Sequence, residues 1–167
     1  MANKKPKTVL QRRKREGKTD YKKRLHLLLA KKPRLVIRTT TTKIIVQIID
    51  FKPVGDVVLV DLSSTELKKK GWNHSYKNIP AAYLTGYLVG KKALEKNIKK
   101  AILDLGFKSP IKGNKIYACL KGVIDAGIEI PHSPEIFPSE ERLTGKHIED
   151  YKDNKITETF KKIKSEL

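Results

Sequence analysis

A run of β-branched residues constrains the fold more than any other feature of this sequence. Residues 35–50, LVIRTTTTKIIVQIID, favour strand over helix, because branched side chains pack well on a pleated sheet. Threonines 40–42 mark the expected turn of a hairpin. They lack the Asn-Gly pair of a tight two-residue turn, so the register stays open. Residues 56–63, DVVLVDLS, predict a third strand and hence an antiparallel meander.

A helix, a strand and a second helix are expected after the meander. The long helix should run from Pro80 to about Lys100, because proline suits the first turn of a helix. Residues 101–107, AILDLGF, predict a short buried strand, and a second helix is expected at about 114–126. The long helix then crosses over and places the fourth strand parallel to one of the first three, with right-handed connection.

Two local motifs refine the helices. Ser63 and Glu66 form a capping box for a short helix, which Gly71 can end. Gly86 and Gly90 form a GxxxG motif within the long helix. In a short helix flanked by lysines, this motif favours close packing on the sheet over dimerisation in a membrane.

The two ends of the chain are expected to differ. Residues 1–18 have few large apolar side chains and should be disordered when alone. Thr19 or Asp20 can cap the following helix, which an apolar stripe should anchor to the body. A last helix carries its own stripe, which must cover its own domain or a neighbour, and the proline-rich connection before it favours the neighbour. The stripes consist of Tyr21, Leu25, Leu28 and Leu29 in the first helix and Ile156, Phe160, Ile163 and Leu167 in the last.

These patterns together predict an α/β fold. It consists of a three-stranded antiparallel meander, a crossover helix to a fourth strand, and helices packed on the sheet. A basic N-terminal arm and a C-terminal helical extension flank this unit. The expected segments are the arm at residues 1–18, the α/β domain at 19–130, and the proline-rich connection with the C-terminal helix at 131–167.

The net charge of +19 is concentrated near the N-terminus. Residues 1–34 contain fourteen Lys or Arg and two acids, giving +12, while residues 35–131 add +8 and residues 132–167 contribute −1. Such a charge opposes compaction, whereas a polyanion neutralises it and gains counterion release. Nucleic acid is the leading partner class because the middle of the chain is also basic. An anionic membrane is second, and a merely solvated tail is the remaining alternative.

Metal, catalytic and membrane functions find little support. The four histidines lack the short spacing of zinc ligands. Cys119, the single cysteine, excludes an internal disulfide and is expected to be a small buried residue rather than a nucleophile. TGKH at 144–147 lacks the earlier glycine of a phosphate loop, since Glu140 stands there. The longest weakly charged run, residues 78–90, is shorter than the roughly 20 residues of a membrane span.

Two segments carry side chains suited to RNA. Residues 68–77, KKKGWNHSYK, combine four lysines with Trp72 and Tyr76, and cations with flat rings can hold phosphates and stack on bases. An equal alternative is a polar loop whose tryptophan packs down on the sheet. In the hairpin, Arg38 and Lys43 flank four threonines, whose hydroxyls can contact sugar and phosphate oxygens or simply line a strand.

Several long stretches, in order, resemble one family. RRKREGKTDYKKRL is followed by KPRLVIR, DLSSTELKKKGW, NIPAAYLTGYLVGKKAL, LDLGF and IYACLKGVIDAGIEIPHSPEIFPSEERLTGKHI. The chain resembles the archaeal form of the universal 5S rRNA-binding protein of the large ribosomal subunit, numbered eighteen in bacterial naming and five in eukaryotic naming. The resemblance covers nearly the whole chain.

The resemblance implies a structural constituent that binds 5S rRNA and helps attach it to the large rRNA in the central protuberance. It implies a cytoplasmic location in the large ribosomal subunit, with large-subunit rRNA and neighbouring large-subunit ribosomal proteins as further partners. No catalysis, cofactor, metal, small-molecule substrate, membrane contact or homo-oligomer is expected. The arm motif, the hairpin and the lysine-tryptophan segment supply the expected RNA-binding residues, with Gly17 letting the backbone turn and Asp20 capping a helix. They are Arg12, Arg13, Lys14, Arg15, Gly17, Lys18, Thr19, Tyr21, Lys22, Arg24, Arg38, Thr40, Thr41, Lys43, Lys69, Lys70 and Trp72.

The chain departs from the family pattern at two places. The family often has a Ser-Asn pair where this hairpin has threonines, and an aromatic residue where Leu10 and Gln11 precede the arginine run. Two alternative functions are a free RNA-binding or RNA-chaperone module and an enzyme on the same scaffold. An enzyme could use a cluster of acids as a metal site, but their strand-end and turn positions favour structural roles. These acids are Asp50, Asp56, Asp61, Asp104 and Asp125.

Overall fold

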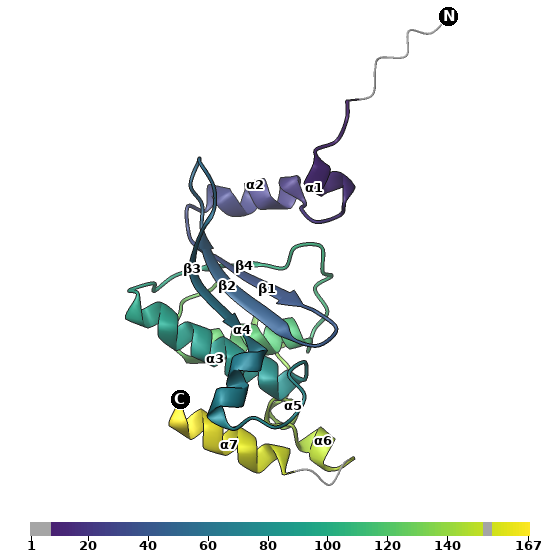
Figure 1. Ribbon diagram of the computed structural model, residues 1–167, viewed down its shortest axis with the longest axis vertical. Coiled ribbons are helices and arrows are strands. Elements are labelled where there is room, and N and C mark those ends of the chain that lie inside the picture. The colour runs from purple at the N-terminus through teal and green to yellow at the C-terminus, as the bar shows by residue number, and fades with distance from the viewer. Residues whose placement is uncertain (1–7, 152–154) are drawn as a thin grey trace, which may run out of the picture.

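A four-stranded sheet forms the centre of the computed structural model, which describes residues 8–151 and 155–167 (Figure 1). The strand order is β3-β2-β1-β4. The first three strands are antiparallel neighbours, and β4 pairs with β1 in parallel. The predicted meander and parallel crossover are therefore confirmed. The strands are β1 (Arg34–Thr39), β2 (Ile44–Asp50), β3 (Val57–Ser63) and β4 (Ile102–Asp104).

The two faces of the sheet have different chemistry because side chains alternate along each strand. On β1, Leu35 and Ile37 are fully buried and join the main core. Arg34, Val36 and Arg38 therefore turn to the opposite face. This alternation gives the sheet one apolar face under the main helices and one face that carries arginines.

Two long helices cover the apolar face of the sheet, α3 (Ile79–Glu95) and α4 (Lys115–Asp125). They approach so closely that a Cβ on Gly86 would collide with the backbone carbonyl of Cys119. A Cβ on Gly122 would likewise collide with the carbonyl of Tyr83. The expectation that the GxxxG motif packs on the sheet is thus wrong: its glycines pack on α4.

The ends of α3 follow from local chemistry. The side-chain oxygen of Asn78 accepts a hydrogen bond from the Ala81 N–H at 2.9 Å, and Pro80 occupies the first turn. The helix ends at Glu95, five residues before the expected Lys100, because Asn97 adopts a left-handed backbone conformation with φ 59°. The lysines after it belong to the connection to β4.

The short helix after β3 is a 3₁₀ helix, η1 (Ser64–Lys70). Gly71, with φ 83°, ends it as expected. The predicted capping box is wrong, because the Ser63 side chain makes no cap hydrogen bond and instead accepts one from the Thr65 hydroxyl at 3.1 Å.

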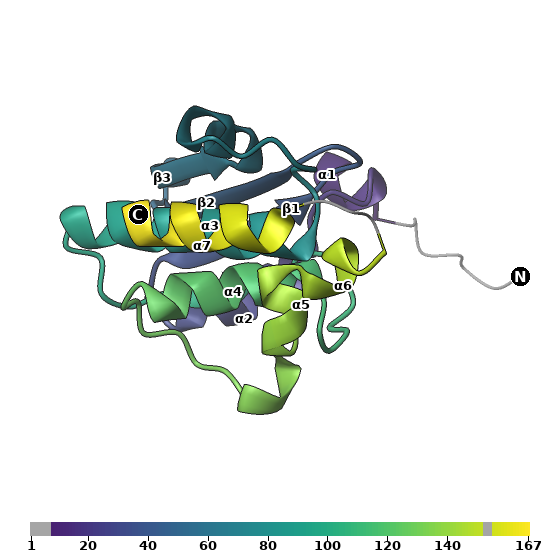
Figure 2. The same cartoon turned by 90° about the horizontal axis from the view of Figure 1, so that it is seen from below.

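The C-terminal helix α7 (Ile156–Glu166) packs on its own domain. Ile156, Phe160 and Ile163 are buried, and the Phe160 ring lies 5.5 Å from the ring of Tyr83 on α3. The preference for a ribosomal neighbour is therefore wrong. The proline-rich connection does not reach away, because three short helices bring the chain back beneath α3 (Figure 2). They are η2 (Pro134–Ile136), α5 (Glu140–Thr144) and α6 (Lys146–Glu149).

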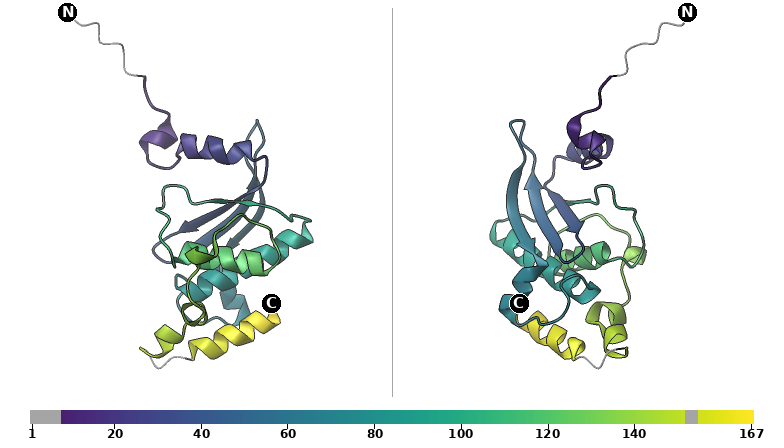
Figure 3. Two further views of the ribbon diagram at one scale, coloured as in Figure 1. Left: turned by 180° about the vertical axis from the view of Figure 1, so that it is seen from behind. Right: turned by 45° about the vertical axis from the view of Figure 1, so that its right-hand side comes forward.

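Two helices at the N-terminal end lie apart from these layers, α1 (Arg12–Arg15) and α2 (Tyr21–Leu29). Disorder was expected for residues 1–18; residues 1–7 lie outside the described part of the chain, and Arg12–Arg15 form one helical turn. Figure 3 shows α2 at one end of the molecule and α7 at the other, with the sheet and the α3–α4 layer between them. No helix among the described residues is long and apolar enough to cross a membrane.

Candidate nucleic-acid interface

Helix α2 presents a row of cations beside the sheet. Asp20 caps it, because one of its carboxylate oxygens accepts hydrogen bonds from the N–H groups of Lys22 and Lys23 at 3.1 Å each. The predicted apolar stripe does not anchor this helix along its whole length, since the side chains of Leu25 and Leu29 are 60% and 70% exposed. The helix instead turns Arg24 toward the sheet, where an ion pair fixes its position.

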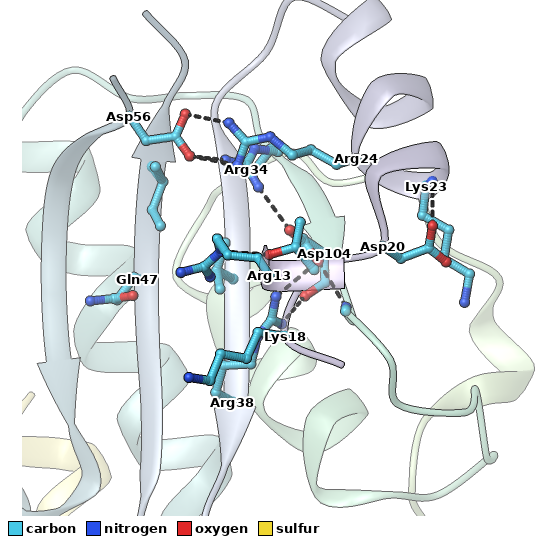
Figure 4. A pocket seen from close by; sticks show the side chains of 14 residues that line it. Arg13, Lys18, Asp20, Lys23, Arg24, Arg34, Arg38, Gln47, Asp56 and Asp104 are labelled. Carbon is cyan, nitrogen blue, oxygen red and sulfur yellow. Dashed lines mark hydrogen bonds and ion pairs between the residues drawn. The ribbon is translucent and has the colours of Figure 1, made fainter. Parts of the chain in front are cut away.

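This ion pair begins a ladder of arginines and aspartates (Figure 4). The Arg24 guanidinium donates two hydrogen bonds of 2.8 Å to Asp56, which precedes β3. Arg34 on β1 donates to the same carboxylate at 2.7 Å and to Asp104 on β4 at 2.8 Å. Paired guanidinium and carboxylate groups of this kind have fixed geometry. The ladder therefore ties α2 to three segments of the sheet.

Asp104 holds a second arginine at the lower end of the ladder. Arg38 donates to the Asp104 carbonyl at 2.8 Å and to its carboxylate at 3.1 Å. The backbone N–H of Gly106 donates to the same carboxylate oxygen at 2.8 Å. Arg38 is thus held along the sheet, although it was expected only as a hairpin contact to RNA.

The pKa of Asp56 is lowered by its arginine partners. Partial burial acts to raise it, but the hydrogen bonds and positive charges of Arg24 and then Arg34 outweigh that effect. Asp56 therefore stays ionised at neutral pH and keeps both guanidinium groups in place.

A cavity of about 250 Å³ lies between α1, α2 and the sheet. Its floor contains Val36, Gln47 and Ile49, and the ladder forms one wall. Arg13, Lys18 and Lys23 contribute from the N-terminal helices and the turn between them. The cavity gathers more cations than acids in a small space that water and a ligand can enter.

The arm residues divide between this cavity and open solvent. Arg13, Lys18 and Thr19 line the cavity, and the Arg13 Nε–H donates to the Thr19 hydroxyl at 2.8 Å. Gly17 has φ 62°, which supports its expected role in turning the backbone. Among the other predicted RNA-binding residues of this segment, Tyr21 is partly buried beside Arg13 and Arg24. The remaining ones are exposed to solvent: Arg12, Lys14, Arg15 and Lys22.

The hairpin threonines serve the turn itself. The Thr40 hydroxyl donates to the Lys43 carbonyl at 2.8 Å and accepts from the N–H groups of Thr42 and Lys43 at 3.3 and 3.0 Å. This hydroxyl is occupied by local hydrogen bonds. Thr41 stays exposed at the tip, so a contact of the turn with RNA remains a prediction for Thr41 and Lys43 rather than for the Thr40 hydroxyl.

The lysine-tryptophan segment lies at the other end of the molecule (Figure 1). Lys69 and Lys70 are exposed on η1, away from the arm. Trp72 is 0% exposed, and its indole N–H donates to the Ser75 carbonyl at 3.2 Å. The prediction that Trp72 stacks on RNA bases is therefore wrong, because the ring fills the core beneath η1.

Sequence reasoning missed part of the site. Arg34, Gln47 and Lys23 were not proposed, and Asp56 and Asp104 were given only structural roles. Strand alternation would have placed Arg34 on the same face as Arg38. Nothing local connects Arg34 with Asp104, which lies 70 residues later in the sequence.

Two of the catalytic alternatives, a metal cluster and a cysteine nucleophile, can be checked among the described residues. No group of three or more His, Cys, Asp or Glu among them could hold a metal ion. Cys119 is fully buried, and this burial raises the pKa of its thiol, so the nucleophilic thiolate is disfavoured.

Comparison with known proteins decides the family. A family model described as ribosomal large subunit proteins 60S L5 and 50S L18 matches residues 5–100 and 95–133. The chain belongs to this family. Its curated relatives carry the name large ribosomal subunit protein uL18. A relative from Korarchaeum cryptofilum is 55% identical over 84% of this chain and 72% of its own length.

Two further archaeal relatives agree over most of their length. The protein from Methanothrix thermoacetophila is 44% identical over 93% of this chain and 92% of its own. That from Methanothermobacter thermautotrophicus is 46% identical over 90% of this chain and 79% of its own. The matches confirm the resemblance to the archaeal form of this family, and they support a structural constituent of the ribosome.

Proposed function

We propose that this chain is a structural constituent of the large ribosomal subunit that binds 5S rRNA and helps attach it to the large rRNA in the central protuberance. Its role is to hold RNA and not to catalyse a reaction. Neighbouring large-subunit ribosomal proteins complete its surroundings.

One observation carries this proposal: the arginine face of the sheet and the basic arm meet around one cavity. The first 34 residues supply +12, and the arginine-aspartate ladder fixes α2 against β1. Phosphate contacts by Arg and Lys supply much of the affinity of RNA-binding proteins, and a rigid sheet positions them. The C-terminal segment 132–167, with a net charge of −1, lacks this concentration of charge.

Binding of 5S rRNA to paired charge variants tests the proposal. Replacing Lys14 of α1 and Lys22 of α2 with Gln should weaken binding, because two phosphate contacts are lost at this end of the molecule. Replacing Lys161 and Lys162 with Gln on α7 removes the same charge from the opposite end and should leave the affinity nearly unchanged. Nucleotide footprinting of 5S rRNA, alone and with the protein, then locates the contact. Equal effects of the two pairs would contradict the proposed orientation, and absence of any footprint would contradict 5S binding.

A further inference from the structure

Two groups of charged side chains line the cavity between α2 and the sheet (Figure 4). In the ladder, the carboxylates of Asp56 and Asp104 are each bound by two arginines, so the ladder holds three guanidinium groups and two carboxylates. On the N-terminal side, called the rim here, Arg13, Lys18 and Lys23 outnumber the single carboxylate of Asp20. A ligand with an uncharged part against the sheet and an anionic part at the rim therefore suits these charges.

Gln47 on the cavity floor has hydrogen-bonding capacity that the described residues do not use. It pairs across the strands with Val36, is half-buried, and its side-chain amide makes no hydrogen bond to another described residue. An amide both donates and accepts, so the edge of a bound group with complementary donors and acceptors would pair with it.

The chemistry of the walls selects among ligands. A phosphate beside the ladder would compete with Asp56 and Asp104 for guanidinium groups that are already paired. A purely apolar group would leave the Gln47 amide without a partner. A flat heterocycle with edge donors and acceptors can rest on Val36 and Ile49 while its edge meets the amide. The volume of about 250 Å³ is below the roughly 300–1,000 Å³ of pockets for drug-sized molecules and suits a single base.

We propose that this cavity receives one unstacked base of the bound RNA. Its sugar-phosphate then lies at the rim, against Arg13, Lys18 and Lys23. RNA-binding proteins commonly recognise bases that leave the stack, because only those expose their edges. The inference rests on the proposed function, and it adds the mode by which the arm and the sheet recognise RNA together.

An abasic scan of 5S rRNA tests the inference against a cavity-filling variant. Removing the base that enters the cavity should weaken binding to the wild-type protein about 5- to 150-fold, the effect of losing one base contact. Gln47→Phe fills the cavity and removes the amide. With this variant, the same abasic RNA should bind as well as intact RNA, because the base no longer has a place to enter.

Val57→Phe provides the matched control. It adds a ring on an exposed strand position of the same sheet that does not line the cavity. This variant should retain the full loss at the abasic position. If Gln47→Phe lowers the melting temperature, Gln47→Leu removes the amide at nearly constant volume and should reduce the abasic effect only in part. 2-Aminopurine at the same nucleotide should report an unstacked base in the wild-type complex.

The outcomes separate this inference from the proposed function. If 5S rRNA binds but no abasic position depends on the cavity, the base inference is overturned and the proposed function stands. A methylphosphonate linkage removes the charge of one phosphate. If one such linkage weakens binding to the wild-type protein but not to Gln47→Phe, and no abasic site behaves this way, a phosphate occupies the cavity and the inference also fails. If 5S rRNA does not bind at all, the proposed function fails first.

Discussion

The arginines and aspartates of the ladder hold one another's side chains in fixed positions. Arg34 is almost fully buried, yet two carboxylates hold its guanidinium, so its charge is matched where it lies. Buried ion pairs add little net stability but are costly to break, because an unmatched charge is then left inside. The ladder is therefore best understood as a positioning device for α2 and for the cavity wall.

Acid should weaken the ladder at Asp56. Its pKa is lowered in the folded protein, so its contribution is fully present above its ordinary pKa near 4 and is lost as pH falls through the lower folded value. Asp56→Asn should therefore be less stable than wild type at pH 6, and the difference should shrink below about pH 4. Urea unfolding across this range checks it. A constant difference at every pH would contradict the assignment to Asp56.

The ladder also shows where prediction from the sequence ends. A strand cation and a turn glycine carry local signals: Arg38 lines the cavity and Gly17 has a positive φ, while their contact with RNA stays a prediction. The partners of Arg34 lie 22 and 70 residues away, and only the folded sheet brings them together. The prediction for Trp72 was wrong for a related reason. An aromatic residue among lysines suggests an exposed side chain, but the burial of Trp72 depends on η1, which covers it in the fold.

Elements of this fold are specified unequally by their sequences. The β-branched runs gave the meander because strand preference is local and strong there. The GxxxG motif correctly predicted close packing of α3. It did not identify the element that the glycines contact, because α3 packs on both the sheet and α4. The stripe of α2 was predicted to anchor the helix, but Leu25 and Leu29 are exposed, and the ion pair of Arg24 with Asp56 ties the helix to the sheet.

The contact between α3 and α4 should not tolerate a methyl group. In Gly86→Ala the new Cβ would meet the backbone of Cys119, which cannot move without shifting α4. Overpacking of this kind destabilises by about 1–3 kcal/mol or more. Thermal or urea unfolding measures it. Gly55→Ala, where no atom lies within 4 Å of the new Cβ, serves as the control and should be close to wild type.

Helix α7 should contribute to the stability of the isolated protein. Phe160 is buried against Tyr83, so Phe160→Ala should lower stability by about 3–5 kcal/mol and reduce the melting temperature accordingly. Phe107→Ala removes a half-exposed ring and should have a much smaller effect. The affinity for 5S rRNA should barely change in either variant. An unchanged melting temperature for Phe160→Ala would mean that α7 docks elsewhere.

The molecule as a whole is polarised. Helices α1 and α2 lie at one end, and α7 of the near-neutral segment 132–167, with a net charge of −1, lies at the other (Figure 3). A protein of this design can meet RNA at one end while its other end remains available for different neighbours. The overall charge balance was predictable from the sequence, whereas the separation into two ends required the fold.

Binding to 5S rRNA should depend strongly on salt. With roughly six phosphate contacts, the logarithm of the binding constant should fall with the logarithm of the salt concentration at a slope of about −4 to −5. Titrations between 50 and about 200 mM salt measure this slope. Neutralising Lys14 and Lys22 should make it shallower, and the α7 lysine pair should leave it unchanged. A slope near zero would show that phosphate contacts do not dominate.

The pairing of β1 with β4 has a consequence for how the chain is made. Arg34 leaves the synthesising ribosome 70 residues before Asp104, its partner on the parallel strand. At about 5–20 residues per second, this interval lasts roughly 4–14 s. During that time the nascent basic segment has emerged without the last strand that completes its support. The highly charged segment before β1 thus emerges several seconds before the strand that completes its support, and an RNA or chaperone that shields it during this interval must act while the chain is still being translated.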